Sequence, residues 1–137
     1  MAANTSPIFV RALRNSYITT GTSANTLFDG TGTVATVFTA DATNGSKIET
    51  VTLANMGTNV ATVIRFFVNN GSTNTTAANN SLVYEVTWAT YAASQVAATT
   101  PVTWNANLYL PANYKLNVTI GTAIASGVMV NAQGGDY

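Results

Sequence analysis

The chain has 137 residues, enough for one domain with a buried core, and its formal net charge is zero. Hydrophobic residues make up 47% of it and charged residues 7%, against an average of about 25% charged residues in soluble domains. So few and such scattered charges exclude the clustered Lys and Arg of a nucleic-acid-binding surface, and a polar surface built from Thr, Asn, Ser and Gly fits dense packing in a larger assembly.

The first segment, residues 1–15, shows no strand or helix period. It is apolar and basic, and its candidate docking residues are Ile8, Phe9, Val10, Arg11, Leu13 and Arg14. We predict an arm that leaves the domain and docks on a partner, with the folded domain over 16–137. An arm of about 15 residues reaches up to roughly 50 Å when extended. The alternative, that 8–13 forms an edge strand of the chain's own sheet, stays open.

Three strands are predicted in the next part of the chain, over 16–20, 34–39 and 47–55. Asn44-Gly45, between the second and the third, is the strongest hairpin-turn signal of the chain. Residues 47–55 alternate well. A regular strand would place Ile48 and Thr50 on one face, with Val51 and Leu53 on the other.

Residues 61–72 are the most hydrophobic stretch that is committed to one conformation. Val63, Ile64, Phe66, Phe67 and Val68 are β-branched or aromatic, and an Asn-Asn-Gly turn follows. This run is expected to be a strand in the middle of a sheet. Both of its faces are largely apolar, whereas a strand with one wet face alternates more cleanly. We therefore expect another sheet, an arm or a neighbouring subunit to cover the second face.

The run 81–88 has the same length and character, so the two runs are predicted to form an antiparallel hairpin. Centred near Thr75, this hairpin gives the facing pairs Arg65–Glu85, Phe66–Tyr84, Phe67–Val83 and Ile64–Val86. Each pair is favourable by roughly 0.2–1 kcal/mol. Arg65 and Glu85, the only charges of the two strands, are interpreted as a structural pair.

The second half continues with short strands. The loop 89–100 is long for a hairpin and is expected to cross between sheets or to reach out to a neighbour. Strands follow over 102–110, 114–120 and 128–137, with a tight turn at 111–113 in which Asn tolerates the left-handed conformation. About eight strands and no convincing helix predict an all-β fold, a single-domain, jelly-roll-like β-sandwich.

The absent residue types limit the chemistry that the chain can perform. There is no Cys and no His, which removes disulfides, thiolate sites and the commonest general base and metal ligand. The five scattered carboxylates show no glycosidase pattern. We therefore expect no enzyme, no cofactor and no metal. There is also no run of 18 apolar residues and no basic and apolar leader, so neither a membrane span nor export is expected.

Several turns and strands, in this order, resemble those of a family of small tailed-phage virion proteins. They are Asp29-Gly-Thr-Gly-Thr33, Asn44-Gly-Ser-Lys-Ile48, Val63-Ile-Arg-Phe-Phe-Val-Asn-Asn-Gly-Ser72, Tyr84-Glu-Val86, Leu110-Pro-Ala-Asn-Tyr-Lys-Leu116 and the ending Gly134-Gly-Asp-Tyr137. The resemblance covers roughly 26–137 and departs from the family at 70–80 and 89–100. It implies a β-sandwich that decorates a capsid, often as a trimer.

The expected function is therefore a non-enzymatic capsid decoration, or cement, protein. Its expected partners are further copies in a homotrimer and the major capsid protein, and its expected place is the virion, after synthesis in the host cytoplasm. Two alternatives stay open. One is a tail or baseplate component. The other is a carbohydrate- or receptor-binding module, whose aromatic platform could come from Trp88, Tyr91, Trp104, Tyr109 and Tyr114.

Overall fold

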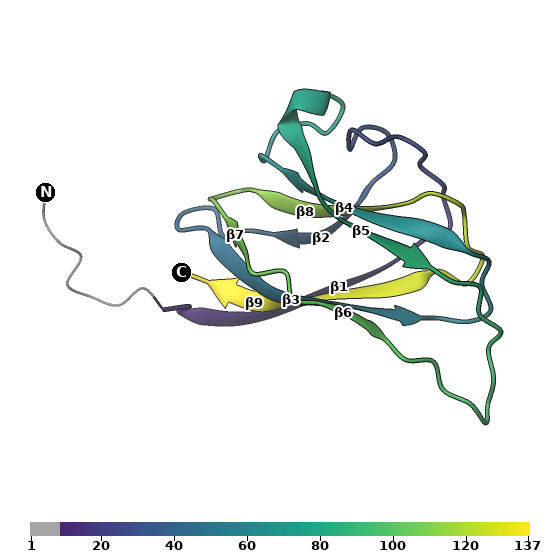
Figure 1. Cartoon of the computed structure of the whole chain (residues 1–137). Helices are drawn as coiled ribbons and strands as arrows, with labels where there is room; N and C mark the ends of the chain where they lie inside the picture. The colour runs from purple at the N-terminus through teal and green to yellow at the C-terminus, as the bar shows by residue number, and fades with distance from the viewer. Residues whose placement is uncertain (1–8) are drawn as a thin grey trace, which may run out of the picture.

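The computed structural model describes residues 9–137, which fold into two antiparallel sheets stacked face to face (Figure 1). The strands are β1 (Ala12–Thr20), β2 (Ala35–Thr39), β3 (Ser46–Asn55), β4 (Thr62–Asn69), β5 (Asn80–Trp88), β6 (Val102–Trp104), β7 (Leu108–Leu110), β8 (Lys115–Ile120) and β9 (Val128–Asp136). A short 3-10 turn, η1 (Ala77–Asn79), precedes β5. The all-β prediction is confirmed.

The strand order is that of a jelly roll. One sheet has the order β1-β9-β3-β6, with β7 also paired to β3, and the other has the order β2-β8-β4-β5. β6 and β7 occupy one strand position, interrupted by Asn107, which takes a positive φ of 46°. The chain is thus one long antiparallel hairpin rolled up, in which β1 pairs β9, β2 pairs β8, β3 pairs β6 and β7, and β4 pairs β5. The prediction of one strand over 102–110 is wrong only in that the strand is interrupted between β6 and β7.

The core lies between the two sheets and consists of apolar side chains from both inner faces. Those with no more than 1% exposure include Phe38, Ile48, Val51, Leu53, Ile64, Phe66, Leu116, Val118, Ile120 and Val130. Each buried side chain of this size contributes about 1.5–3 kcal/mol by removal from water. The core therefore fixes which face of each strand is left for other contacts.

A bulge in β3 corrects the predicted faces of that strand. The register of β3 against β9 shifts between Ile48 and Thr50, so Ile48 points inward before the shift and Val51 and Leu53 point inward after it. Strict alternation would have separated Ile48 from the other two. Gly134 makes this possible, because a Cβ there would overlap the backbone oxygen of Lys47.

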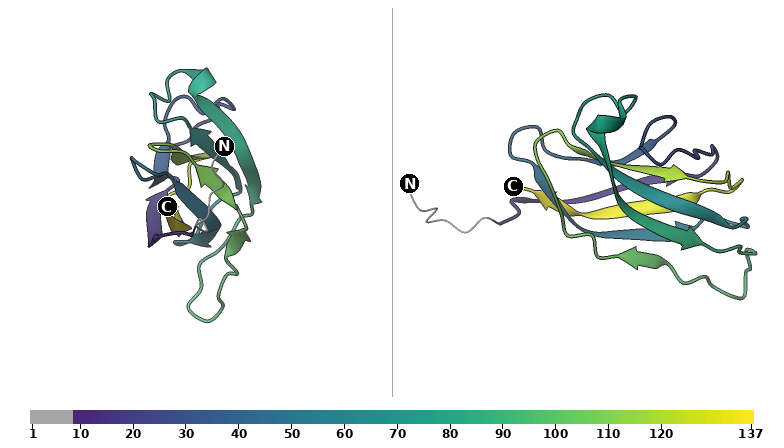
Figure 2. Two further views of the ribbon diagram at one scale, coloured as in Figure 1. Left: turned by 90° about the vertical axis from the view of Figure 1, so that its left-hand side faces the viewer. Right: turned by 45° about the horizontal axis from the view of Figure 1, so that its top comes forward.

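Most connections cross between the sheets, and two of these crossings bear on the sequence predictions. The turn at Asn44-Gly45 is confirmed, with Gly45 at a φ of 77°. It does not close a hairpin, because β2 pairs β8 in one sheet while β3 pairs β9 in the other. The loop 89–101 joins β5 to β6 of the opposite sheet, as expected, and projects from one end of the sandwich (Figures 1 and 2).

The central hairpin follows the predicted register over most of its length. β4 lies between β8 and β5, and Arg65 faces Glu85, Phe66 faces Tyr84 and Ile64 faces Val86. The predicted pair Phe67–Val83 is wrong, since the register shifts after Phe66 and Phe67 faces Leu82. Because both faces of this strand pair are largely apolar, the alternation of residue types gives no signal for a bulge of one residue.

The predicted arm boundary at residue 15 is wrong. β1 begins at Ala12 and pairs with β9, so Leu13 and Arg14 belong to the sandwich, and the N–H of Arg11 donates to the Asp136 oxygen at 2.7 Å. The open alternative, an edge strand of the chain's own sheet, therefore applies from Ala12 onward. The strand alternation was not recognised in the sequence because the charged Arg14 occupies a position that faces inward. Ile8 lies outside the described residues.

Candidate interaction surface

The outer face of the β2-β8-β4-β5 sheet is covered by the chain's own loops, and we call it the covered face. Residues on this face are buried although they point away from the core, among them Arg65, Phe67, Asn117 and Thr119 at 7%, 1%, 3% and 2% exposure. The segment 21–34 lies over them, with Gly30 close to Phe67. The apolar second face of β4 is therefore satisfied within one chain and no longer argues for a neighbouring subunit there.

Hydrogen bonds hold this cover in shape. The Asn25 amide donates to the backbone oxygens of Thr31 and Thr33 at 2.8 and 2.7 Å, and the Asn74 amide donates to that of Gly32 at 2.9 Å. Asp29 accepts from the Thr31 hydroxyl at 2.6 Å and from its N–H at 3.0 Å. These two bonds, the hydroxyl's first, hold the pKa of Asp29 below its ordinary value. These hydrogen bonds give the cover a defined conformation.

Arg65 and Glu85 form the predicted pair at the rim of the cover. Nε of Arg65 donates to Oε1 of Glu85 at 3.2 Å, and the ring of Phe28 stacks on the guanidinium with its centroid 4.0 Å away. The Arg65 side chain is 8% exposed and that of Glu85 is 42% exposed. Nη1 of Arg65 is buried without a hydrogen-bond partner. The guanidinium is held between the carboxylate and the Phe28 ring, so the geometry fits a structural pair.

The opposite outer face, that of β1, β9, β3 and β7, carries no such cover, and we call it the uncovered face. It displays Leu13, Asn15, Tyr17, Thr19, Lys47, Thr50, Thr52, Tyr109, Met129, Asn131 and Gln133. Leu13, Tyr17 and Tyr109 are 90%, 67% and 69% exposed. Lys47 and Glu49 bring charges to this face, and Nζ of Lys47 lies 3.4 Å from Oε1 of Glu49. The result is a broad sheet surface of amides, hydroxyls and aromatic rings.

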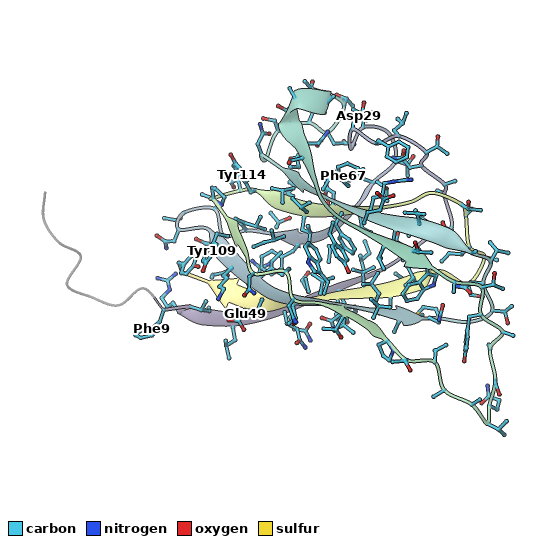
Figure 3. The ribbon with its side chains drawn as sticks, viewed as in Figure 1. Phe9, Asp29, Glu49, Phe67, Tyr109 and Tyr114 are labelled. Carbon is cyan, nitrogen blue, oxygen red and sulfur yellow. The ribbon has the colours of Figure 1, made fainter. Side chains whose placement is uncertain are left out.

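One end of the uncovered face is hollowed beside the start of the described chain. Phe9, Val10, Lys47, Glu49, Tyr109 and Tyr137 line an open hollow of about 670 Å³. The side chain of Val10 packs over Gly135, where a Cβ would overlap it. Figure 3 shows Phe9, Glu49 and Tyr109 at this end of the molecule, with Phe9 pointing away from the sheet. Such a hollow can receive protruding side chains of a partner.

Some of the predicted docking residues are exposed to solvent, and one is already paired within the chain. Phe9 is 75% exposed and Leu13 is 90% exposed, and Arg11 is exposed as well. Arg14 is turned inward, where Nη1 donates to Asp136 at 3.0 Å and to the backbone oxygen of Thr39 at 2.8 Å. In this conformation Arg14 is therefore paired within its own chain.

The five aromatic residues considered for a glycan platform do not form one surface, and the two that share a hollow are Trp88 and Tyr91. Trp88 is 4% exposed and its indole N–H donates to Asn55 at 3.0 Å. Trp104 stacks on Tyr84 with centroids 4.4 Å apart, and Tyr114 packs against the core. Tyr109 points outward on its own strand. Burial is thus the correct interpretation of the tryptophan on β5, and the one on β6 is half-buried.

Sequence reasoning missed most of the uncovered face. Asn15, Tyr17, Asn131 and Gln133 were not singled out, although they alternate with inward-facing residues along β1 and β9. An alternation in which the outward residues of β1 and β9 are polar but uncharged could have identified them.

Over residues 9–137 there is no group of three or more His, Cys, Asp or Glu side chains that could hold a metal ion. The same part of the chain contains no helix long and apolar enough to cross a membrane. The chain matches no protein-family model, no curated protein and no solved structure in the comparisons made.

Proposed function

We propose that this chain is a non-enzymatic structural protein of a tailed-phage virion, a decoration protein that binds the major capsid protein lattice and stabilises the head. The uncovered face carries the proposal. It exposes Leu13, Tyr17 and Tyr109 on a broad sheet surface, with Phe9 exposed at its end. The family resemblance of the turns and strands agrees with it.

The composition of this face suits a large contact that is made by packing. A stable interface buries about 800 Å² per partner, and apolar area removed from water contributes roughly 25 cal/mol per Å². Ionised groups add a desolvation penalty when they are buried, and the uncovered face presents few of them. Binding energy that accumulates over many copies would hold neighbouring capsid subunits together.

Binding of the purified chain to heads that lack it tests the proposal. Wild-type protein should cosediment with the heads and raise the temperature at which they release DNA. Leu13→Asp and Tyr17→Asp should reduce cosedimentation strongly, because each places a charge in the contact. Ser81→Asp, at an exposed position of β5, is the matched control and should bind like the wild type. Binding to isolated tails, with none to heads, would contradict the proposal.

The arm stays a prediction for the residues before β1 and has its own test. If the residues before β1 act as an arm, deleting residues 1–8 should leave the melting temperature unchanged while capsid binding weakens. Deleting 1–15 should also destabilise the fold, because it removes part of β1 and the bond between Arg14 and Asp136. Undiminished binding of the shorter truncation would refute the arm.

A further inference from the structure

The sandwich has four edge positions, and natural sheets protect their edges because unpaired N–H and C=O groups attract other strands. β1 and the β6–β7 position bound one sheet, and β2 and β5 bound the other. The four edges differ in how far they are protected.

Three of the edges carry recognisable protection. β2 has five residues and a register shift, and its Val37 and Thr39 oxygens accept bonds from Ser16 Oγ and Arg14 Nη1 at 2.7 and 2.8 Å. β6 and β7 have three residues each and are separated by residues 105–107, the last of which has a positive φ. β5 is bulged opposite β4, and its Glu85 side chain is 42% exposed. Short length, bulges and charge all discourage strand addition.

β1 has none of these devices. It runs for nine residues in unbroken register with β9 and contains no proline. Its single charge, Arg14, is withdrawn to Asp136 and the Thr39 oxygen. Among the described residues, the backbone of Ala12–Thr20 makes hydrogen bonds to β9 and to no other strand. One long edge of the molecule is therefore ready to accept a further strand.

We propose that this edge pairs with β1 of a second copy, antiparallel and across a two-fold axis. An antiparallel strand is complementary to itself, so one surface serves both partners. With the axis near Ser16, Leu13 faces Thr19 of the second copy and Asn15 faces its Tyr17. Exposed Leu13 and Tyr17 gain neighbours, and no like charges meet because Arg14 points inward.

The pairing joins two sheets into one, so the two uncovered faces become a single continuous surface. It also predicts a two-fold dimer in place of the trimer that the family resemblance implied. The inference needs no capsid and does not depend on the proposed function, so its test uses the purified full chain alone.

Sedimentation equilibrium across the micromolar range is the first measurement. Wild-type protein should be a dimer. Asn15→Lys/Thr19→Lys should raise the dissociation constant roughly tenfold or more, because lysines at an edge repel an added strand. Ser81→Lys/Thr87→Lys places the same charges at exposed positions of the β5 edge and should leave the dimer intact. At concentrations low enough for the wild type to be monomeric, all three proteins should melt alike, since the altered side chains are exposed.

Disulfide trapping supplies an independent measurement, because the chain has no cysteine of its own. Facing residues of antiparallel strands have Cα atoms about 4.5–5.5 Å apart, within the range of a disulfide. An oxidised mixture of Asn15→Cys and Tyr17→Cys should give a linked dimer, and the control mixture of Ser81→Cys and Thr87→Cys should not. A monomer, a trimer, a dimer unaffected by the β1 lysines, or a dimer that is not trapped by the β1 cysteines would each overturn the proposal.

Discussion

The two outer faces of the sandwich differ in whether the chain itself covers them. On the covered face, the chain lays its own segment 21–34 over the sheet and buries Arg65, Phe67 and Thr119 beneath it. On the uncovered face, Leu13 and Tyr17 remain in water. The difference between the faces therefore lies in what covers them. A strand that is apolar on both sides therefore does not by itself identify an intermolecular contact.

The largest expected difference between the faces is in the stability that their aromatic residues provide. Phe67→Ala should lower the free energy of unfolding by about 3–5 kcal/mol, because Phe67 is 1% exposed and its removal leaves a cavity. Tyr17→Ala should change it by about 0.5 kcal/mol or less, since Tyr17 is 67% exposed. Urea denaturation of both variants measures this. Equal losses would contradict the distinction between the faces.

The pair at the rim of the cover should respond unequally to the loss of either partner. Glu85→Ala leaves the buried Arg65 guanidinium, whose Nη1 already has no partner, without its anion, and should destabilise the fold by about 3 kcal/mol. Arg65→Met leaves Glu85, which water can reach, and should destabilise by about 1 kcal/mol. Chemical denaturation compares the two. A larger loss for Arg65→Met would mean that the pair is not governed by desolvation of the arginine.

The fit of the cover on the sheet can be tested at two glycines. Gly30 has a φ of 75°, and a Cβ there would lie 2.6 Å from Asn80 Cβ. Gly32 has a φ of 79°, but its nearest contacts would be 3.2 Å away. Each change to Ala should lower the free energy of unfolding by about 1–2 kcal/mol, because Ala disfavours the left-handed backbone. Any further loss of stability in Gly30→Ala then measures the steric contact with Asn80. Thermal melts of both variants measure it, and identical values would show that the cover yields easily.

The sequence predicts the architecture well, because the turn signals and the strand patterns agree with each other. The pairing of Arg65 with Glu85 follows from two runs of equal length, and Asn113 takes the left-handed conformation expected of it, with a φ of 66°. It does not predict the bulges at Glu49 and Val83, because an insertion of one residue depends on how the neighbouring strand packs. Gly134 signals the first bulge only once its contact with Lys47 is known.

The two candidate surfaces were harder to predict than the fold. Nothing local in 22–33 indicates that this segment folds back over β4, since the contact between Phe28 and Arg65 joins distant parts of the chain. The edge strand at Ala12–Thr20 was missed over its first residues because an inward arginine breaks the apolar period, and the bond from Arg14 to Asp136 that explains it is again long-range.

The smallest expected effect concerns the hydrogen bonds within the cover. The Thr31 hydroxyl is the largest cause of the lowered pKa of Asp29, so Thr31→Val should raise that pKa toward the ordinary value of 3.8. Asp41 is the internal reference. Its pKa is lowered mainly by the N–H groups of Asn44 and Thr43, which the substitution does not touch, and it should not move. Carboxyl titration followed by NMR measures both.

The same change should alter the pH dependence of stability in a fixed direction. A group whose pKa is lower in the folded state stabilises the fold above its unfolded pKa, and this contribution is lost as the pH falls through the folded value. The wild type should therefore melt slightly above Thr31→Val at neutral pH, and the gap should close below the ordinary value of 3.8. A gap that stays constant into acid would show that Thr31 acts through packing and not through the carboxylate.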